Sequence, residues 1–250
     1  MSLVSILLVC CLSFIVSIFS ISVGGTSLIT VPVLISLGMI SKNAVATNMF
    51  ALIFLSMSGA IGFRKEIRIP DHKIIAFLSI LTIIGSLIGA SLISAIEKNI
   101  LKKVIAIIIC IITCTFLFKK DSGVQTRNEK ISKIKLGWGA LIIFILGIYG
   151  GFFSGGYVTI LSYVLILTFG LNFLQVAFIT KILNIFSSLM ACAFFYYHDL
   201  IDFSIGIPLA FSMSSGAFLG TKLALAKGNL WIRNIFIIAV ILLAIKLLIF

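Results

Sequence analysis

Residues 22–27, SVGGTS, interrupt an apolar run with two adjacent glycines, and residues 149–159, YGGFFSGGYVT, interrupt a second run in the same way. Each cluster precedes an apolar segment of about 14 residues, whereas a helix needs about 20 to cross a bilayer. Glycine allows close backbone approach or local unwinding, and the freed N–H groups then need partners that lipid cannot offer. The clusters therefore predict breaks in membrane segments, located beside protein or a wet cavity.

Composition indicates an all-α polytopic membrane protein. Of the 250 residues, 61% are hydrophobic and 10% are charged, against about 45–50% and about 25% in soluble domains. The 19 Lys and Arg, 7 Asp and Glu and two His cannot cover a soluble fold of this size. The net charge of +12 comes from cations between apolar runs, which is typical of membrane topology signals rather than of a nucleic-acid surface. We expect a lipid bilayer as partner and no nucleic acid.

Breaks between apolar runs divide the chain into ten segments and two halves. Residues 1–118 form the first transmembrane repeat, residues 119–135 (KKDSGVQTRNEKISKIK) a basic linker, and residues 136–250 the second repeat. The predicted segments are 3–22, 27–40, 44–63, 74–95 and 100–118, then 136–153, 157–170, 174–196, 204–226 and 231–250.

Internal repetition supports this division. Several features recur 130 or 131 residues later, and one recurs 133 residues later, which indicates a duplication with a short insertion. The matched features are Gly24-Gly25 with Gly155-Gly156, Gly85-x3-Gly89 with Gly216-x3-Gly220, Asn99 with Asn229, and Thr47-Asn48 with Thr180-Lys181.

Loop charges predict how the halves are oriented. The linker and the 64–73 loop are basic and belong in the cytoplasm under the positive-inside rule. The loop around Asp199 has no Lys or Arg, whereas the next one contains Lys227, so the charge bias is inverted between halves. This favours inverted-topology repeats. The three lysines at 96–103 oppose that arrangement, and parallel four-span halves remain the alternative.

The glycine clusters are candidate anion sites. Short, glycine-interrupted helices at matching positions in two halves point to a transport site near the midplane, where half-helix N-termini face an anion. Close helix packing is the alternative, and it suits the two Gly-x3-Gly motifs better. The substrate-binding candidates in the clusters are Gly24, Gly25, Thr26, Ser27, Ser154, Gly155, Gly156 and Tyr157.

Lys181 is the only charge deep inside a predicted span, roughly 10 Å from the start of 174–196. Every Asp and Glu maps to a loop, so no acid within a span is available to pair with it. A lysine at a helix centre costs about 2.5–3.5 kcal/mol, and an anionic ligand would offset this cost. Asn184 shares its helix face, and Thr47 and Asn48 occupy the matching region of the first half. The alternatives are a lysine that snorkels to the interface and amides that join helices.

Catalytic and metal-binding constellations are not predicted. His72 and His198 lie in loops beside Asp71 and Asp199, and the five cysteines lie in apolar runs without CxxC spacing. We therefore expect a transporter without metal or cofactor rather than an enzyme. Without an intramembrane carboxylate relay, the membrane potential could drive anion export. A membrane sensor or interaction protein that does not transport is the second hypothesis.

The order and spacing of these motifs resemble the sulfite exporter TauE/SafE family. The resemblance covers nearly the whole chain and is carried by Gly24-Gly25-Thr26-Ser27-Leu28, Val31-Pro32, Ala46-Thr47-Asn48, Gly150-Gly151-x-x-Ser154-Gly155-Gly156 and Lys181-x-x-Asn184. It implies an inner (plasma) membrane transporter, an exporter of sulfite, organosulfonates or other sulfur oxyanions. Tyr157 to Tyr163 depart from the family pattern, which usually has a third glycine and a proline here.

Overall fold

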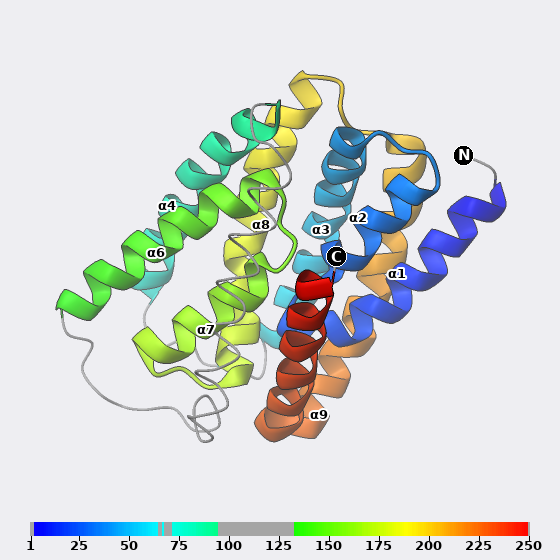
Figure 1. Cartoon of the computed structure of the whole chain (residues 1–250). Helices are drawn as coiled ribbons and strands as arrows, with labels where there is room; N and C mark the ends of the chain where they lie inside the picture. Colours follow the sequence, from blue (N-terminus) through cyan, green and yellow to red (C-terminus); the bar gives the residue numbers. More distant parts are fainter. Residues whose placement is uncertain (1–2, 65–66, 68–71, 95–132, 250) are drawn as a thin grey trace.

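The structure is a computed structural model that describes residues 3–64, 67, 72–94 and 133–249, and the described part is helical, without strands (Figure 1). Six of the described helices are long and apolar enough to span a membrane, and two are shorter, which confirms the expected helical membrane architecture. The predicted segment 100–118 and most of the linker lie outside the described residues. The helices are α1 (Leu3–Val23), α2 (Thr26–Ser36), α3 (Ser41–Arg64), α4 (His72–Ser91), the 3-10 turn η1 (Leu92–Ser94), α6 (Lys133–Phe152), α7 (Tyr157–Phe169), α8 (Phe173–Tyr197) and α9 (Phe203–Ile249).

The last two predicted segments form one element with an internal break. Gly228 interrupts α9 with non-helical φ 75° and ψ −171°, and the chain reverses direction there (Figure 1). The expected segments 204–226 and 231–250 therefore correspond to the two arms of α9. We call them the first and second arms.

The long helices run in two opposite directions. Residues later in α1 and in α3 contact residues later in the first arm of α9, so these three helices run parallel to one another. The contacts of α4 with α6 also advance together along the chain, and α8, which accepts from the Ser86 hydroxyl of α4 at Ser187, runs in the same direction in Figure 1. In contrast, Ser56 of α3 meets Asn184 of α8 and the later Gly59 meets the earlier Lys181, so α3 and α8 are antiparallel. One set thus contains α1, α3 and the first arm of α9, and the other contains α4, α6 and α8 (Figure 1).

The two Gly-x3-Gly motifs form matching close contacts between helix backbones, which we call seams. A Cβ on Gly89 of α4 would lie 1.9 Å from the carbonyl oxygen of Ile148 in α6. A Cβ on Gly220 of α9 would lie 2.1 Å from the carbonyl oxygen of Ile18 in α1. Backbones this close exclude any side chain, which confirms helix packing as the role of these motifs. Each seam joins a helix of one predicted half to a helix of the other.

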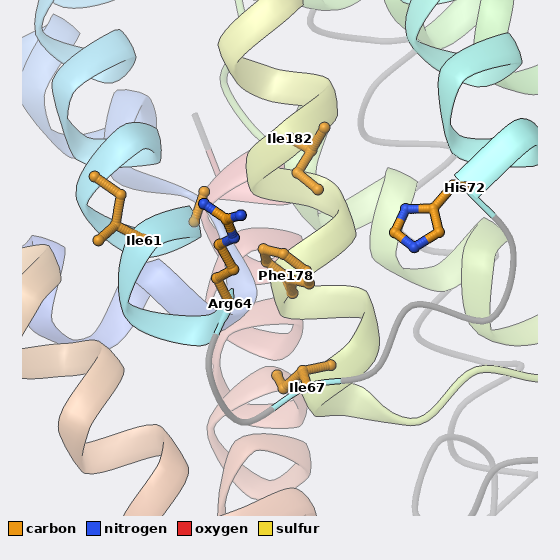
Figure 2. A pocket seen from close by; sticks show the side chains of 7 residues that line it. Ile61, Arg64, Ile67, His72, Phe178 and Ile182 are labelled. Carbon is orange, nitrogen blue, oxygen red and sulfur yellow. The ribbon is translucent and has the colours of Figure 1, made fainter.

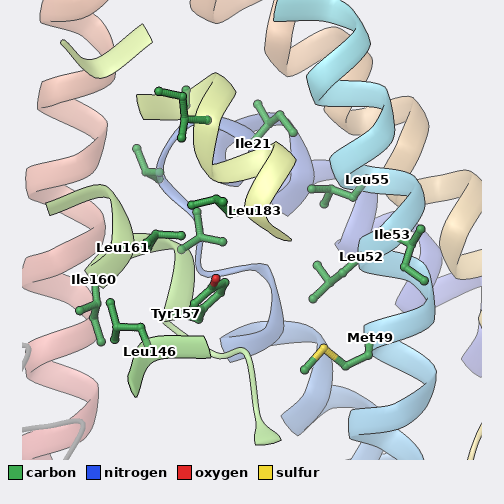
Figure 3. Packing of buried hydrophobic residues seen from close by; sticks show 14 of the residues in the cluster. Ile21, Met49, Leu52, Ile53, Leu55, Leu146, Tyr157, Ile160, Leu161 and Leu183 are labelled. Carbon is green, nitrogen blue, oxygen red and sulfur yellow. The ribbon is translucent and has the colours of Figure 1, made fainter. Parts of the chain in front are cut away.

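The buried core surrounds α3, α7 and α8, while apolar side chains on the outer helices remain exposed. Ile15 of α1 is 54% exposed and Ile145 of α6 is 55% exposed, as expected for side chains in contact with lipid. Figure 3 shows Tyr157 of α7 within the core, below Leu183 of α8 in this view, with Met49 and Leu52 of α3 across from it. The core thus includes the start of α7, which directly follows the second glycine cluster.

Candidate functional site

Both glycine clusters reverse the chain through left-handed backbone. Gly24 and Gly25 have φ of 83° and 95° between α1 and α2. Ser154 and Gly156 have φ of 61° and 81° between α6 and α7. Left-handed φ costs a residue with a side chain about 1–2 kcal/mol, which explains glycine at three of these positions and makes Ser154 unusual. Each reversal starts a short helix, α2 or α7.

The two clusters contact each other. A Cβ on Gly24 would lie 2.7 Å from Cβ of Val158 and 3.0 Å from the backbone nitrogen of Thr159, so the first turn of α7 approaches the α1–α2 reversal directly. The Thr159 hydroxyl donates to the carbonyl oxygen of Val23 over 2.9 Å. The Tyr149 hydroxyl donates to the carbonyl oxygen of Gly155 inside the second cluster. The N-terminal ends of α2 and α7, which carry positive partial charge, therefore lie close together.

A buried polar network extends from these reversals to α3. The Asn48 amide Nδ2 donates to Oγ of Ser27 over 2.8 Å, and its Oδ1 accepts from Oγ1 of Thr30 over 2.7 Å. Ser27 Oγ donates to Oγ of Ser154 over 3.4 Å, which links the two clusters through side chains. All four residues are buried. We call Ser27, Thr30, Asn48 and Ser154 the amide–hydroxyl network.

Lys181 lies in α8, about 12 Å from its first residue at 1.5 Å per residue. It is 1% exposed, and its stem lies against α3, where a Cβ on Gly59 would come within 3.2 Å of Lys181 Cγ. Within the described part of the chain, no carboxylate or hydrogen-bond acceptor pairs with its ammonium group. One turn further along α8, Asn184 Nδ2 donates to Oγ of Ser56 over 2.7 Å. Lys181 and Asn184 therefore face α3 together, as their spacing predicts.

The predicted residues form two groups rather than one. Asn48 belongs to the amide–hydroxyl network, whereas Lys181 meets α3 at Gly59, which is about 16 Å further along the helix axis. Ile21 connects the two levels, because a Cβ on Gly59 would lie 2.5 Å from its Cδ1 and Ile21 precedes Gly24 by one helical turn. Thr47 lies apart from both groups, where its hydroxyl accepts from the backbone nitrogen of Asp202 over 3.0 Å.

The remaining predicted residues have mainly packing contacts. Tyr157 is fully buried, and its ring lies against Gly150, where a Cβ would be 2.9 Å from Cδ2 of the tyrosine. Gly155 lies against Leu28, and Thr26 bonds to the hydroxyl of Ser20. A Cβ on Gly25 would lie 3.8 Å from Cδ1 of Leu28, which is an ordinary van der Waals contact. Among the described residues, no three His, Cys, Asp or Glu side chains gather as a metal site.

Three residues that take part in these groups were not predicted. Thr30 follows Ser27 by three residues on the same helix face, so the helical spacing could have indicated it. Ser56 and Gly59 have no signal in the sequence, because their partners Asn184 and Lys181 belong to another helix more than 120 residues away. Only the packing of α3 on α8 brings them together.

Comparisons with known proteins identify the family of the chain. Residues 9–247 match the family model described as Sulfite exporter TauE/SafE. The chain is 30% identical over 228 residues to a "Probable membrane transporter protein" of Haemophilus influenzae, covering 91% of this chain and 88% of that protein. It is 28% identical over 229 residues to "Probable membrane transporter protein YfcA" of Escherichia coli strain K12, covering 90% and 82% of the two chains. No solved structure matches. The match across nearly the whole chain confirms the resemblance seen in the motifs: the chain belongs to the TauE/SafE sulfite exporter family of membrane transporters.

Proposed function

We propose that the chain exports small anions, with sulfite, organosulfonates or other sulfur oxyanions as substrates, across the inner (plasma) membrane. The observation that carries this proposal is Lys181, which is buried in a span and has no acidic partner among the described residues. A charge in this environment is costly unless a ligand of opposite sign compensates it. The convergent N-terminal ends of α2 and α7 also favour negative charge.

The anion binds between the two halves in this proposal. Lys181 and Asn184 belong to the second half and lie against Gly59 and Ser56 of the first. The amide–hydroxyl network also joins the halves, because Ser154 is bonded to Ser27. Hydroxyl and amide donors suit oxyanions.

The second part of the proposal is that the two halves are inverted repeats. They comprise residues 1–118 and 136–250, and the basic linker 119–135 joins them. Helices at matching positions run in opposite directions: α1 against α6, α3 against α8, and α4 against the first arm of α9. The two Gly-x3-Gly seams pair Ile18 with Gly220 and Ile148 with Gly89, so the matched isoleucines are 130 residues apart and the matched glycines 131. These observations support a two-fold axis in the membrane plane over parallel halves.

The membrane potential drives this export without a coupled ion. The described Asp199 and Asp202 lie in the connection between α8 and α9, and the sequence has no acid within a predicted span to relay protons. An inside-negative potential favours outward movement of an anion by about 2.3 kcal/mol per charge per 100 mV.

Flux in reconstituted vesicles tests the proposal. The purified protein is inserted into proteoliposomes, and uptake of radiolabelled sulfite and of a labelled alkanesulfonate is measured with and without an imposed potassium-diffusion potential. We expect protein-dependent flux that a potential positive on the accumulating side increases. Flux equal to that of protein-free vesicles for every sulfur anion would contradict transport and favour a membrane sensor or interaction protein.

A further inference from the structure

A pocket opens at the end of the molecule where α3 ends and α4 begins (Figure 2). Its volume is about 640 Å³, within the range of about 300–1,000 Å³ that is common for small-molecule sites. It is lined by Ala60, Ile61, Arg64, Ile67, His72, Phe178 and Ile182. None of these residues belongs to the amide–hydroxyl network.

The lining combines an apolar wall with two nitrogen-bearing side chains. Arg64 and His72 are the polar groups, and both are exposed, whereas Phe178 is 4% exposed and forms part of the wall. Figure 2 shows the Arg64 guanidinium beside Phe178 and Ile61, with the His72 ring across the pocket. A guanidinium presents a planar fork of donors that matches a carboxylate, sulfonate or phosphate. The described acids, Asp199 and Asp202, lie at the opposite end, and Glu66 and Asp71 are outside the described residues.

The pocket is lined by sequence neighbours of Lys181 and of Gly59 on two helices. Phe178 precedes Lys181 by three residues on α8, and Ile182 follows it immediately. On α3, Ala60 and Ile61 come directly after Gly59, against which the Lys181 stem lies. Along the helix axes, Phe178 and Ile182 thus lie within about 5 Å of Lys181, and Ala60 and Ile61 within about 3 Å of Gly59.

We propose that this pocket is a capture site for small organic anions, in which the anionic group meets Arg64 and His72 and a short apolar body rests against Ile61, Phe178 and Ile182. The inference rests on the proposed anion transport and adds a second station, which the anion occupies before it reaches Lys181. An apolar wall offers nothing to a bare oxyanion, so the pocket discriminates in favour of anions with a carbon body.

Thiol modification measures the site without measuring transport. Ile61→Cys, at a position that is 68% exposed and lines the pocket, is introduced after the native cysteines are replaced. Its reaction rates with an anionic and a cationic methanethiosulfonate reagent are compared in proteoliposomes of neutral lipid. We expect the anionic reagent to be favoured and Arg64→Gln to lower this preference by about tenfold, since a cleft of one charge sign concentrates counter-ions by about that factor or more. Lys227→Gln, which removes an exposed cation that does not line the pocket, should leave the preference unchanged.

Protection of the introduced cysteine from the thiol reagent by added compounds identifies the class of ligand. Propane-1-sulfonate should slow modification of Ile61→Cys at concentrations where sulfate and propan-1-ol do not, and Arg64→Gln should abolish the protection. Equal protection by sulfate, or none by propanesulfonate, would overturn the proposal. Anionic lipid is the other source of such a group, and the measurement is therefore repeated with added phosphatidylglycerol. Protection by that lipid alone would assign the pocket to lipid and overturn capture of a free anion.

The flux assay separates the capture site from the transport function on which it rests. If the wild-type protein transports propanesulfonate, Arg64→Gln should raise KM at least about threefold with little change in kcat, which is the signature of lost uniform binding. Flux without protection would contradict the capture site but leave the transport function standing. Protection without flux of any sulfur anion would contradict transport, and with it the role of the pocket as a capture site.

Discussion

Lys181 is the residue whose replacement distinguishes a transport site from a structural lysine. Lys181→Met keeps the apolar stem against Gly59 and removes the charge, so folding should be retained. If the ammonium binds the anion, flux should fall by at least about tenfold, which is equivalent to about 1.4 kcal/mol. The measurement is the initial flux of labelled anion per correctly inserted protein.

Two controls make this result interpretable. Lys227→Met removes an exposed cation and should leave flux unchanged. Lys181→Arg should not restore transport, because a planar fork cannot replace a compact ammonium beside Gly59. Unchanged flux in Lys181→Met would mean that the lysine only anchors α8 against α3.

Ser154 offers a test in which stability and transport should move in opposite directions. Its φ of 61° is strained for a serine, so Ser154→Gly should stabilise the fold by about 0.5–1 kcal/mol. The same change removes the hydroxyl that accepts from Ser27, and flux should fall. Thermal unfolding in detergent and vesicle flux are measured together, with Ser154→Ala as the variant that loses the hydroxyl but keeps the strain. Full flux in the more stable Ser154→Gly would remove Ser154 from the site.

At this scale the sequence predicts residues better than it predicts their partners. Lys181 and Asn184 could be paired from their spacing, because helix geometry relates residues three apart. Gly59 and Ser56 could not, since nothing local distinguishes them from other small residues of α3. For the same reason the sequence could not show that Lys181 meets α3 at Gly59, about 16 Å along the helix axis from Asn48.

Helix seams are where glycine has its largest effect on stability. A methyl group on Gly220 would lie 2.1 Å from the carbonyl oxygen of Ile18, so α1 and α9 must separate to admit it. We expect Gly220→Ala to destabilise the protein by about 1–3 kcal/mol, the usual cost of overpacking, and to lower Tm in detergent. Gly89→Ala should have a similar effect through the matching seam of α4 and α6.

Gly137 provides the matched control for these substitutions. It also lies within a helix, α6, but a Cβ there would meet nothing within 4 Å. Gly137→Ala should be neutral or stabilise by about 0.5–1 kcal/mol, because alanine is the better helix former. Equal losses of Tm at Gly137 and Gly220 would show that helix propensity, and not the seam, determines the result.

Apolar patterning in the sequence predicts the positions of individual helices well. Predicted boundaries for α1, α3, α7 and α8 lie within about three residues of the structure, because glycine breaks and charged loops delimit the apolar runs. The short segment predicted at 27–40 is shorter still, since α2 ends at Ser36 and Gly38 has a left-handed φ of 96°. Apolar runs identify a helix but not its neighbours, so the pairing of α1 with α9 and of α4 with α6 was not predictable.

The distribution of charge over the whole molecule relates the fold to the membrane. Arg64, Lys135 and Lys227 lie at one end of the helix bundle, where α3 ends and α6 begins (Figure 1). Asp199 and Asp202 lie at the other end, in the turn between α8 and α9. Under the positive-inside rule we expect the first end to face the cytoplasm. The pocket with Arg64 and His72 would then be open to the cytoplasm, the side from which an exported anion arrives.

Accessibility of single cysteines tests this orientation and the inverted repeats together. Asp199→Cys and Lys227→Cys are made after the native cysteines are replaced, and intact cells are treated with a membrane-impermeant thiol reagent. Both positions lie near ends of the first arm of α9, so they should be on opposite sides of the membrane. We expect Asp199→Cys to react from outside and Lys227→Cys only after the cells are permeabilised, because the cationic end is retained in the cytoplasm. Labelling of Asp199→Cys only from inside would reverse the orientation, and would place Arg64 and its pocket on the face where an exported anion leaves rather than arrives.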